Sequence, residues 1–262
     1  MMWTIIGFGR TGHYLAQEIE NIGGAWFGTK RQENKEAGIK SLDLSSIDTL
    51  PSMEELSQLF EGRVVVFLIP PSSYHSEVFQ YLCNNLKTSA QLFVQVSSTS
   101  IFEKNHGEVF DETLPEFESE RAKKVFEAEN LFVDLAQSQS CPHFRIRSSG
   151  LFDDQNHPAY FLNKKEEISF TDKERLSLIH RRELARVILW VKENFADLPS
   201  VLNASYPTSQ TKYHYYENLF KTLGLKSQLK VIPDNSSWRH IVPKLLINSG
   251  FKFQNDPNGF KA

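Results

Sequence analysis

The stretch that decides the fold is Trp3-Thr4-Ile5-Ile6-Gly7-Phe8-Gly9-Arg10-Thr11-Gly12. An apolar run leads into three glycines spaced G-x-G-x-x-G, and Leu15, Ile19 and Ile22 then recur at helical spacing. The first glycine allows a tight turn, the second lets a pyrophosphate approach the backbone, and the third lets the helix pack closely on the strand. The stretch therefore predicts a strand, a phosphate-binding turn and a helix.

This turn is expected to hold an adenine dinucleotide. The residues predicted to contact it are Gly7, Phe8, Gly9, Arg10, Thr11 and Gly12. The pattern alone is weak, but here it follows a strand-like run and opens a helix-like segment, which is the context that gives it meaning. The alternative is a tight strand–helix turn that binds no ligand.

Strand-like and helix-like segments alternate along the rest of the chain. Strands are expected at 25–27, 64–68, 92–96 and 144–147, and helices at 53–60, 76–86, 121–136, 181–191 and 212–223. Such alternation predicts an α/β fold, a Rossmann-like doubly wound parallel sheet with a small C-terminal α/β substrate lobe. We assign 1–150 to the dinucleotide-binding domain, to which 175–205 return, and 151–174 with 206–262 to the lobe.

Composition bounds the functional class. The 262 residues include only two cysteines, so no disulfide framework is expected, and the net charge of −3 argues against a broad nucleic-acid-binding surface. The longest apolar run, at 64–71, is too short to span a membrane, and the first residues lack a basic signal-peptide region. We therefore expect a cytoplasmic protein without membrane or nucleic-acid partners. The eight histidines show no zinc-site spacing, so no metal is predicted.

The end of the second expected strand predicts the choice of cofactor. NAD-binding folds usually place an acid there for the ribose hydroxyls, whereas this chain has Gly28-Thr29-Lys30-Arg31. Lys30 and Arg31 suit a 2′-phosphate, and Arg10 adds a third cation, so NADP(H) is predicted in preference to NAD(H). Thr29 lies in the same segment, and Asp43 is expected to close over the adenine. After the strand at 64–68, the residues expected beside the nicotinamide ribose are Ile69, Pro70 and Pro71.

Four stretches carry a family resemblance. They are Val96-Ser97-Ser98-Thr99-Ser100-Ile101-Phe102, Arg145-Ile146-Arg147-Ser148-Ser149-Gly150-Leu151-Phe152, Leu178-Ile179-His180-Arg181-Arg182-Glu183-Leu184-Ala185, and 238–253. In order and spacing the chain resembles the extended short-chain dehydrogenases/reductases, the NAD(P)-dependent sugar-nucleotide epimerase/dehydratase family. The resemblance implies a nicotinamide cofactor, oxidoreductase or epimerase chemistry, and a homodimer. It also implies that the hydroxyl of Ser98 bonds a substrate oxygen.

The chain differs from that family at the positions of the catalytic residues. Aligned on Glu129, Arg121 stands at the place of the catalytic tyrosine and Val125 at the place of the lysine, so the Tyr-x-x-x-Lys pair is missing. The chain thus resembles an atypical branch of the family. A Tyr-x-x-x-Lys match at 160–164 is interpreted as coincidence, although Tyr160 is retained as a candidate that enters the pocket from the lobe.

The predicted catalytic residues are Ser98 and Thr99 at the carboxyl end of a central strand, with Arg121 and Tyr160 as further candidates. We expect a small polar substrate, and the positive charge of Arg121 would suit an anionic one. The first hypothesis is an NADP(H)-binding oxidoreductase or epimerase-like enzyme. The second is a non-catalytic NADP(H) sensor or regulatory protein, which the missing pair favours. A third, a relative of 6-phosphogluconate dehydrogenase, predicts an all-helical C-terminal domain.

Overall fold

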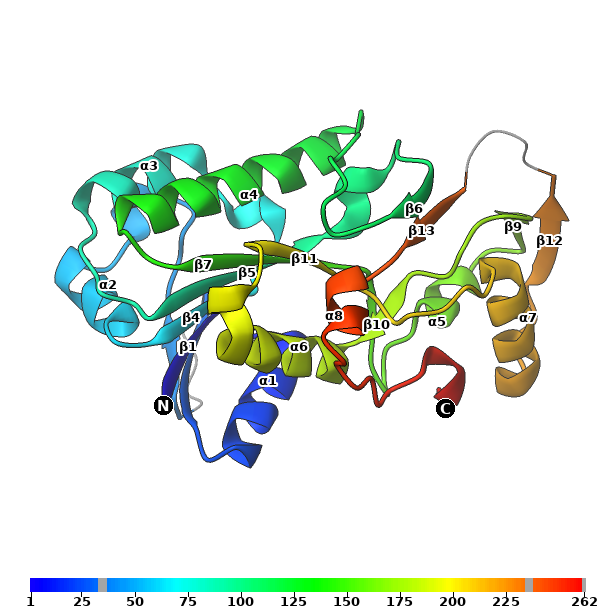
Figure 1. Cartoon of the computed structure of the whole chain (residues 1–262), viewed down its shortest axis with the longest axis horizontal. Coiled ribbons are helices and arrows are strands. Elements are labelled where there is room, and N and C mark those ends of the chain that lie inside the picture. Colours follow the sequence, from blue (N-terminus) through cyan, green and yellow to red (C-terminus); the bar gives the residue numbers. More distant parts are fainter. Residues whose placement is uncertain (33–36, 234–237, 261–262) are drawn as a thin grey trace.

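A parallel sheet runs through the centre of the computed structural model, which describes residues 1–32, 37–233 and 238–260 (Figure 1). In this described part the sheet has seven strands, in the order β11-β7-β5-β4-β1-β2-β3. They are β1 (Met2–Ile6), β2 (Ala25–Lys30), β3 (Ile39–Ser41), β4 (Val64–Phe67), β5 (Leu92–Ser98), β7 (His143–Ser148) and β11 (Val201–Ala204). Every neighbouring pair is parallel, which confirms the predicted α/β class.

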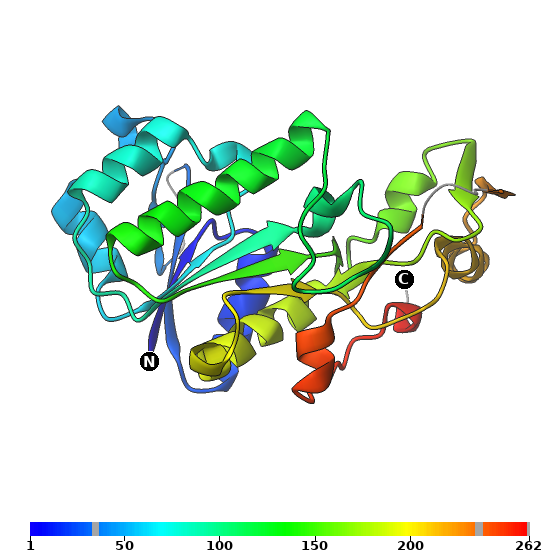
Figure 2. The same cartoon turned by 45° about the horizontal axis from the view of Figure 1, so that its top comes forward.

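Helices cover both faces of the sheet (Figures 1 and 2). One face carries α1 (Arg10–Asn21) and α6 (Arg181–Asn194), and the other carries α2 (Met53–Phe60), α3 (Ser76–Asn85) and α4 (Glu120–Ser138). The central strand β4 is apolar throughout, because helices bury it from both sides. Ile22 differs from its predicted place in the buried stripe: α1 ends at Asn21, and Ile22 is 58% exposed.

A smaller lobe lies beyond the carboxyl ends of the strands. Its helices are α5 (Pro158–Leu162) and α7 (Lys212–Leu223), whereas α8 (Lys244–Asn248), which the sequence assigned to the lobe, packs on the core of the central sheet beside β11. Its paired strands are β6 (Gly107–Val109) with β13 (Arg239–Ile241), β8 (Gly150–Phe152) with β10 (Leu178–His180), and β9 (Glu167–Thr171) with β12 (Gln228–Ile232). Because strands accompany the helices here, this region is not the all-helical domain of the third hypothesis.

Short 3-10 helices connect several elements. They are η1 (Ile47–Thr49), η2 (Pro71–Ser73), η3 (Thr99–Phe102), η4 (Phe195–Asp197) and η5 (Pro257–Gly259). The aromatic core of the lobe includes Phe170, Tyr215, Tyr216 and Phe220. None of the described helices is both long enough and apolar enough to cross a bilayer.

The fold positions a site at one edge of the sheet. The arrowheads of β5 and β7 point towards the lobe (Figure 2), so the residues after these strands face it. Open α/β sheets bind ligands at the carboxyl ends of their strands. The glycine turn after β1, the proline-rich segment after β4 and the hydroxyl cluster after β5 all meet at this edge.

Candidate functional site

Two hollows meet at the carboxyl edge of the sheet. The larger one, here called the strand-end cavity, has a volume of about 970 Å³, and the smaller one, the turn-side groove, has a volume of about 630 Å³. Both are lined by Gly7, Gly9, Leu68, Ile69 and Pro70. One continuous space therefore runs from the end of β2, past the glycine turn, to the lobe.

The first two glycines of the turn serve different purposes. Gly7 has a φ of +87°, and a Cβ there would lie 2.8 Å from Cγ2 of Ile69, so the turn needs glycine at this position. Gly9 has a φ of −103°, and a Cβ there would meet nothing within 4 Å. Gly9 therefore faces open space on the side where the two hollows join.

The third glycine of the motif serves packing. Phe8 is 2% exposed, and its ring stacks on Trp26 at a centroid distance of 4.8 Å. A Cβ on Gly12 would lie 3.2 Å from the Phe8 ring, and one on Gly28 would lie 2.7 Å from it. Gly12 is absent from the linings of both hollows, so its place is beneath the turn, where it lets α1 approach β1.

The start of α1 offers donors to the open space. Gly9 is its N-cap and supplies no side-chain hydrogen bond, and the first N–H groups of any helix lack partners within the helix. Arg10 and Thr11 of this first turn line the strand-end cavity. A pyrophosphate placed against Gly9 would meet these donors and the positive end of the helix dipole. The residues present thus fit a dinucleotide.

The end of β2 carries the predicted cations. Lys30, Arg31 and Thr29 all line the turn-side groove. Thr29 is buried and holds the turn: its Oγ1 accepts the N–H of Gly7 at 3.3 Å, and its carbonyl accepts the N–H of Phe8 at 2.6 Å. The side chain of Arg31 is 60% exposed, and its Nη2 donates to Oγ of Ser73 at 3.2 Å.

Asp43 faces an arginine in this structure. Its Oδ1 lies 3.8 Å from Nε of Arg31 and accepts the N–H of Ser45 at 3.0 Å. Leu42 and Leu44, on either side of it, line the turn-side groove, whereas Asp43 itself does not. The carboxylate therefore balances Arg31 at the edge of the groove.

Hydroxyl groups cluster at the end of β5. Ser97, Ser98, Thr99 and Ser100 all line the strand-end cavity. Ser98 caps η3, because its Oγ accepts the N–H of Ser100 at 3.2 Å. Its own O–H has no acceptor within the described chain and is available to a ligand. Ser97 instead donates to Oε1 of Glu129 at 2.7 Å.

Glu129 anchors a buried charge network behind the hydroxyls. This fully buried carboxylate of α4 accepts hydrogen bonds from Nε and Nη2 of Arg147 at 3.1 and 2.9 Å. Arg145 adds a contact at 3.3 Å from its Nη1. Two guanidinium groups thus compensate one carboxylate, and their pairing fixes Ser97 at the cavity wall.

Arg181 links the lobe to the glycine turn. It opens α6 and lines the strand-end cavity. Its Nε donates to Oδ2 of the buried Asp153 at 2.8 Å, and its Nη1 donates to Oγ1 of Thr11 at 2.9 Å. Arg181 was not predicted as a site residue, although it directly follows His180 in one of the four stretches that carry the resemblance.

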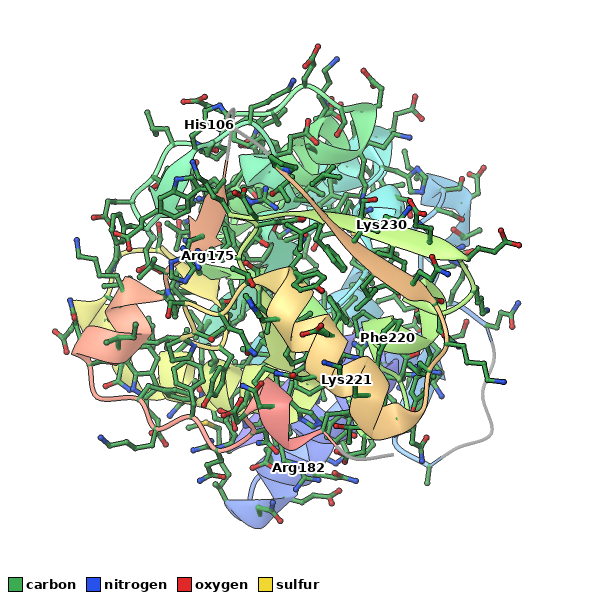
Figure 3. All side chains as sticks on the ribbon, turned by 90° about the vertical axis from the view of Figure 1, so that its right-hand side faces the viewer. His106, Arg175, Arg182, Phe220, Lys221 and Lys230 are labelled. Atoms are coloured by element: carbon green, nitrogen blue, oxygen red, sulfur yellow. The ribbon has the colours of Figure 1, made fainter. Side chains whose placement is uncertain are left out.

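The outer part of the strand-end cavity is strongly cationic. Arg121 of α4 lines it, together with Arg175, Lys212 and Arg239 from the lobe. Arg175 lies at the lobe end of the molecule, to the left of α7 in Figure 3. The last three were missed at the sequence level, because nothing in their local sequence shows that a loop, the start of α7 and the start of β13 converge here.

Other candidates lie away from the cavity. Tyr160 is 37% exposed on α5, its ring packs on Phe260 with centroids 6.2 Å apart, and it does not line the strand-end cavity. Val125 is buried in an apolar cluster with Phe102. Among the described residues that line the cavity there is no tyrosine, histidine or cysteine.

Comparisons with known proteins concern the fold. No protein-family model matches the sequence, and no curated protein matches it. A structure from Methylobacillus flagellatus, provisionally named an NAD-dependent epimerase/dehydratase, superposes with a TM-score of 0.75 at 18% identity, covering 96% of this chain and 92% of that one. UDP-N-acetylglucosamine 4-epimerase from Bacillus cereus gives 0.74 at 13% identity, covering 98% and 95%.

A third structure was solved with its cofactor. UDP-glucuronic acid 4-epimerase from Bacillus cereus, in complex with NAD, gives a TM-score of 0.73 at 13% identity and covers 98% of this chain and 93% of that one. At these identities the likeness shows the shared fold rather than a shared activity. The chain therefore has the fold of the NAD-dependent epimerases and dehydratases.

Proposed function

We propose that this protein binds NADP(H) and carries out an oxidoreductase or epimerase-like reaction on a small anionic metabolite. The observation that carries the proposal is the wall that the two hollows share. Gly9 lines both the turn-side groove and the strand-end cavity, and Ser98 lines the strand-end cavity. A dinucleotide lying along the groove would bring its reactive end to these hydroxyls.

The residues of the groove suit a nicotinamide dinucleotide. Its pyrophosphate would be held by the N–H groups at the start of α1, and its nicotinamide ribose would lie beside Ile69, Pro70 and Pro71. Preference for NADP(H) is supported by Lys30 and Arg31, since cations there match a 2′-phosphate. The solved epimerase carries NAD, so on this point the proposal departs from that neighbour. When bound, the nicotinamide ring accepts or donates a hydride.

The substrate end of the site would be organised by hydroxyl groups and cations. Ser98 would donate a hydrogen bond to a substrate oxygen, the buried Thr99 would support it, and Arg121 would attract negative charge. A hydroxyl of ordinary pKa transfers protons poorly at neutral pH. Any hydride transfer is therefore expected to be slow, or to take its proton from water or substrate.

A second candidate function is a non-catalytic NADP(H) sensor. It is favoured by the absence of tyrosine, histidine and cysteine from the described lining of the strand-end cavity. Of the acids in that lining, Glu103 accepts the N–H groups of Glu118 and Ser119, which hold its pKa at about 2, and Glu174 pairs with Lys212. Neither carboxylate is free to act as a base without losing its partners.

The two functions are separated by following NADPH oxidation over a panel of activated carbonyl compounds. For an enzyme, Ser98→Ala should lower kcat/KM by roughly tenfold to a thousandfold, the range for losing a well-placed donor. Thr208→Ala, outside the lining of the strand-end cavity, is the matched control and should leave the rate unchanged. Tight NADPH binding without turnover of any compound would favour the sensor.

A further inference from the structure

Arg239 carries a buried nitrogen without a partner. Its Nη1 is shielded from solvent and makes no hydrogen bond within the described chain, although the residue lines the strand-end cavity. Buried polar groups are nearly always hydrogen-bonded, and an unpaired charged donor is costly. Burial also lowers the pKa of the guanidinium, which still remains charged near neutrality. A ligand anion in the cavity would supply the missing acceptor.

Strand pairing fixes where this guanidinium lies. Arg239 is in register with Gly107 in the β13–β6 pair, and the N–H of Gly107 donates to the carbonyl of Trp238 at 2.6 Å. Gly107 has a φ of +75°, which glycine adopts without strain. β6 follows η3 closely in sequence, so the pairing holds Arg239 near the segment that begins with the hydroxyl cluster.

The nearby acids are already engaged. The carboxylates of Glu174 and Glu103 attract the guanidinium of Arg239 electrostatically and raise its pKa, but neither forms an ion pair with it. Glu103 accepts the N–H of Glu118 at 2.6 Å and the hydroxyl of Ser119 at 2.7 Å. Glu174 pairs with Lys212. The positive charge of Arg239 is therefore left for a ligand.

Arg121 supplies a second cation at the same end. Ser119 is the N-cap of α4, and Glu103 holds it, so the first turn of α4 is fixed beside the segment that approaches Arg239. Arg121 stands in that turn, is exposed, and makes no hydrogen bond or ion pair within residues 1–32, 37–233 and 238–260. Arg121 and Arg239, both without an ion-pair partner among the described residues, thus line the same cavity.

The lining gives a nucleobase little to stack on. Trp238 is the one aromatic side chain among the described residues of the strand-end cavity. Its ring already carries the guanidinium of Arg175, with Cζ 5.9 Å from the ring centroid. Other lobe residues of the lining include the small polar Thr171 and Ser177 and the charged Glu174 and Lys212. This wall suits hydroxyls and anions rather than a planar base.

We infer that Arg239 and Arg121 form an anion subsite that takes the phosphate of a small phosphorylated sugar or polyol, not of a nucleotide-linked sugar. The inference rests on the proposed function, because it assigns the substrate class of that site. With the phosphate held there, the hydroxyls of the substrate would face Ser98 and its neighbours. The class differs from the UDP-linked sugars named for the structural neighbours.

The test measures binding to protein saturated with NADPH, so that the cofactor occupies its own phosphate contacts. Inorganic phosphate, glucose 6-phosphate, glucose and UDP-glucose are titrated by calorimetry into the wild type, Arg239→Met, Arg121→Met and Arg182→Met. Arg182 does not line the cavity, so Arg182→Met removes one positive charge elsewhere and is the control for the other two variants. Methionine keeps the aliphatic stem, and the exposed Arg121 can be replaced without disturbing the core.

We expect the wild type to bind phosphate and to bind glucose 6-phosphate more tightly, with glucose far weaker. Arg239→Met and Arg121→Met should each weaken both phosphate probes by about tenfold to a hundredfold, the range for charge-assisted hydrogen bonds, and Arg182→Met should not. The inference is overturned if no phosphate probe binds, if the variants bind as the wild type does, or if UDP-glucose binds more tightly than glucose 6-phosphate.

Failure of the proposed function would look different. If NADPH itself does not bind, the cofactor assignment is wrong, and the phosphate titrations are then repeated on the cofactor-free protein. A difference between wild type and Arg239→Met would still support the subsite, and equal affinities would overturn it. Unchanged NADPH affinity in Arg121→Met is also required, because a loss there would assign Arg121 to the phosphates of the cofactor instead.

Discussion

Gly9→Val should separate cofactor binding from folding. Gly9 has a φ of −103°, a conformation open to any L-residue, and an added Cβ would meet nothing within 4 Å. The branched side chain would therefore enter the space where the hollows join instead of striking the protein. That space is where a pyrophosphate must approach the backbone.

The two expected magnitudes differ widely. Valine is a poorer N-cap than glycine, so a stability loss of about 1 kcal/mol is expected, or roughly 2–4 °C in Tm for a chain of this size. Binding should fall by more than about a hundredfold, which is about 2.7 kcal/mol, because the side chain takes the place of the phosphates. Calorimetric titration of NADPH beside a thermal melt measures both quantities.

Two other glycines provide the controls. A Cβ on Gly259 also meets nothing within 4 Å, and Gly259 lines neither hollow, so Gly259→Val should change neither binding nor Tm appreciably. A Cβ on Gly28 would lie 2.7 Å from the Phe8 ring, so Gly28→Val should lower stability by about 1–3 kcal/mol through overpacking. NADPH affinity retained by Gly9→Val would refute the assignment of the turn to a phosphate site.

Two further predictions concern cofactor choice and pH. Replacing Lys30 and Arg31 together by alanine should remove most of the preference for NADPH over NADH, about 1.5–3 kcal/mol; equal affinity for the two cofactors in the wild type would contradict the reasoning. Burial lowers the pKa of His157 from 6.5 to about 4. As the pH falls, the imidazole of His157 therefore takes up a proton in the unfolded chain before it does so in the folded protein. The contribution of this residue to the free energy of unfolding is fully present above pH 6.5 and declines by about 3 kcal/mol as the pH falls towards 4. Urea unfolding at pH 7 and pH 4.5 should show a smaller decline in His157→Gln, and an equal decline in both proteins would assign the acid sensitivity to other groups.

Much of the sheet was predictable because of how it is buried. β4 is covered on both faces, so it appears in the sequence as a continuous apolar run, and β5 begins with the buried apolar residues Leu92, Phe93 and Val94. β3, β6 and β13 were not predicted. Each has three residues and one buried side chain, Ile39, Val109 or Ile241, which is too little for any periodicity to show.

Only those residues of the candidate site that directly follow a strand could be predicted from the sequence. Ser98 and Thr99 follow directly from the rule that parallel sheets bind ligands at their carboxyl edge. Arg239 could not be found in this way, since its place depends on β13 pairing with a strand far earlier in the chain. Tyr160 is the opposite case. The Tyr-x-x-x-Lys pattern made it a candidate, but in the fold its ring packs on Phe260 and it does not line the strand-end cavity.

The predicted absence of a tyrosine–lysine pair is in line with the packing of α4 around Val125. Val125, at the place of the lysine, is 3% exposed among Ile101, Phe102, Val109 and Ile241. A lysine at this position would bury an ammonium group without a partner, at a cost of several kcal/mol. Because that cluster also supports η3, the substitution would disturb the hydroxyl residues it was meant to serve. We therefore expect any chemistry at this site to depend on the hydroxyls of β5 and η3 and on the arginines that line the same cavity.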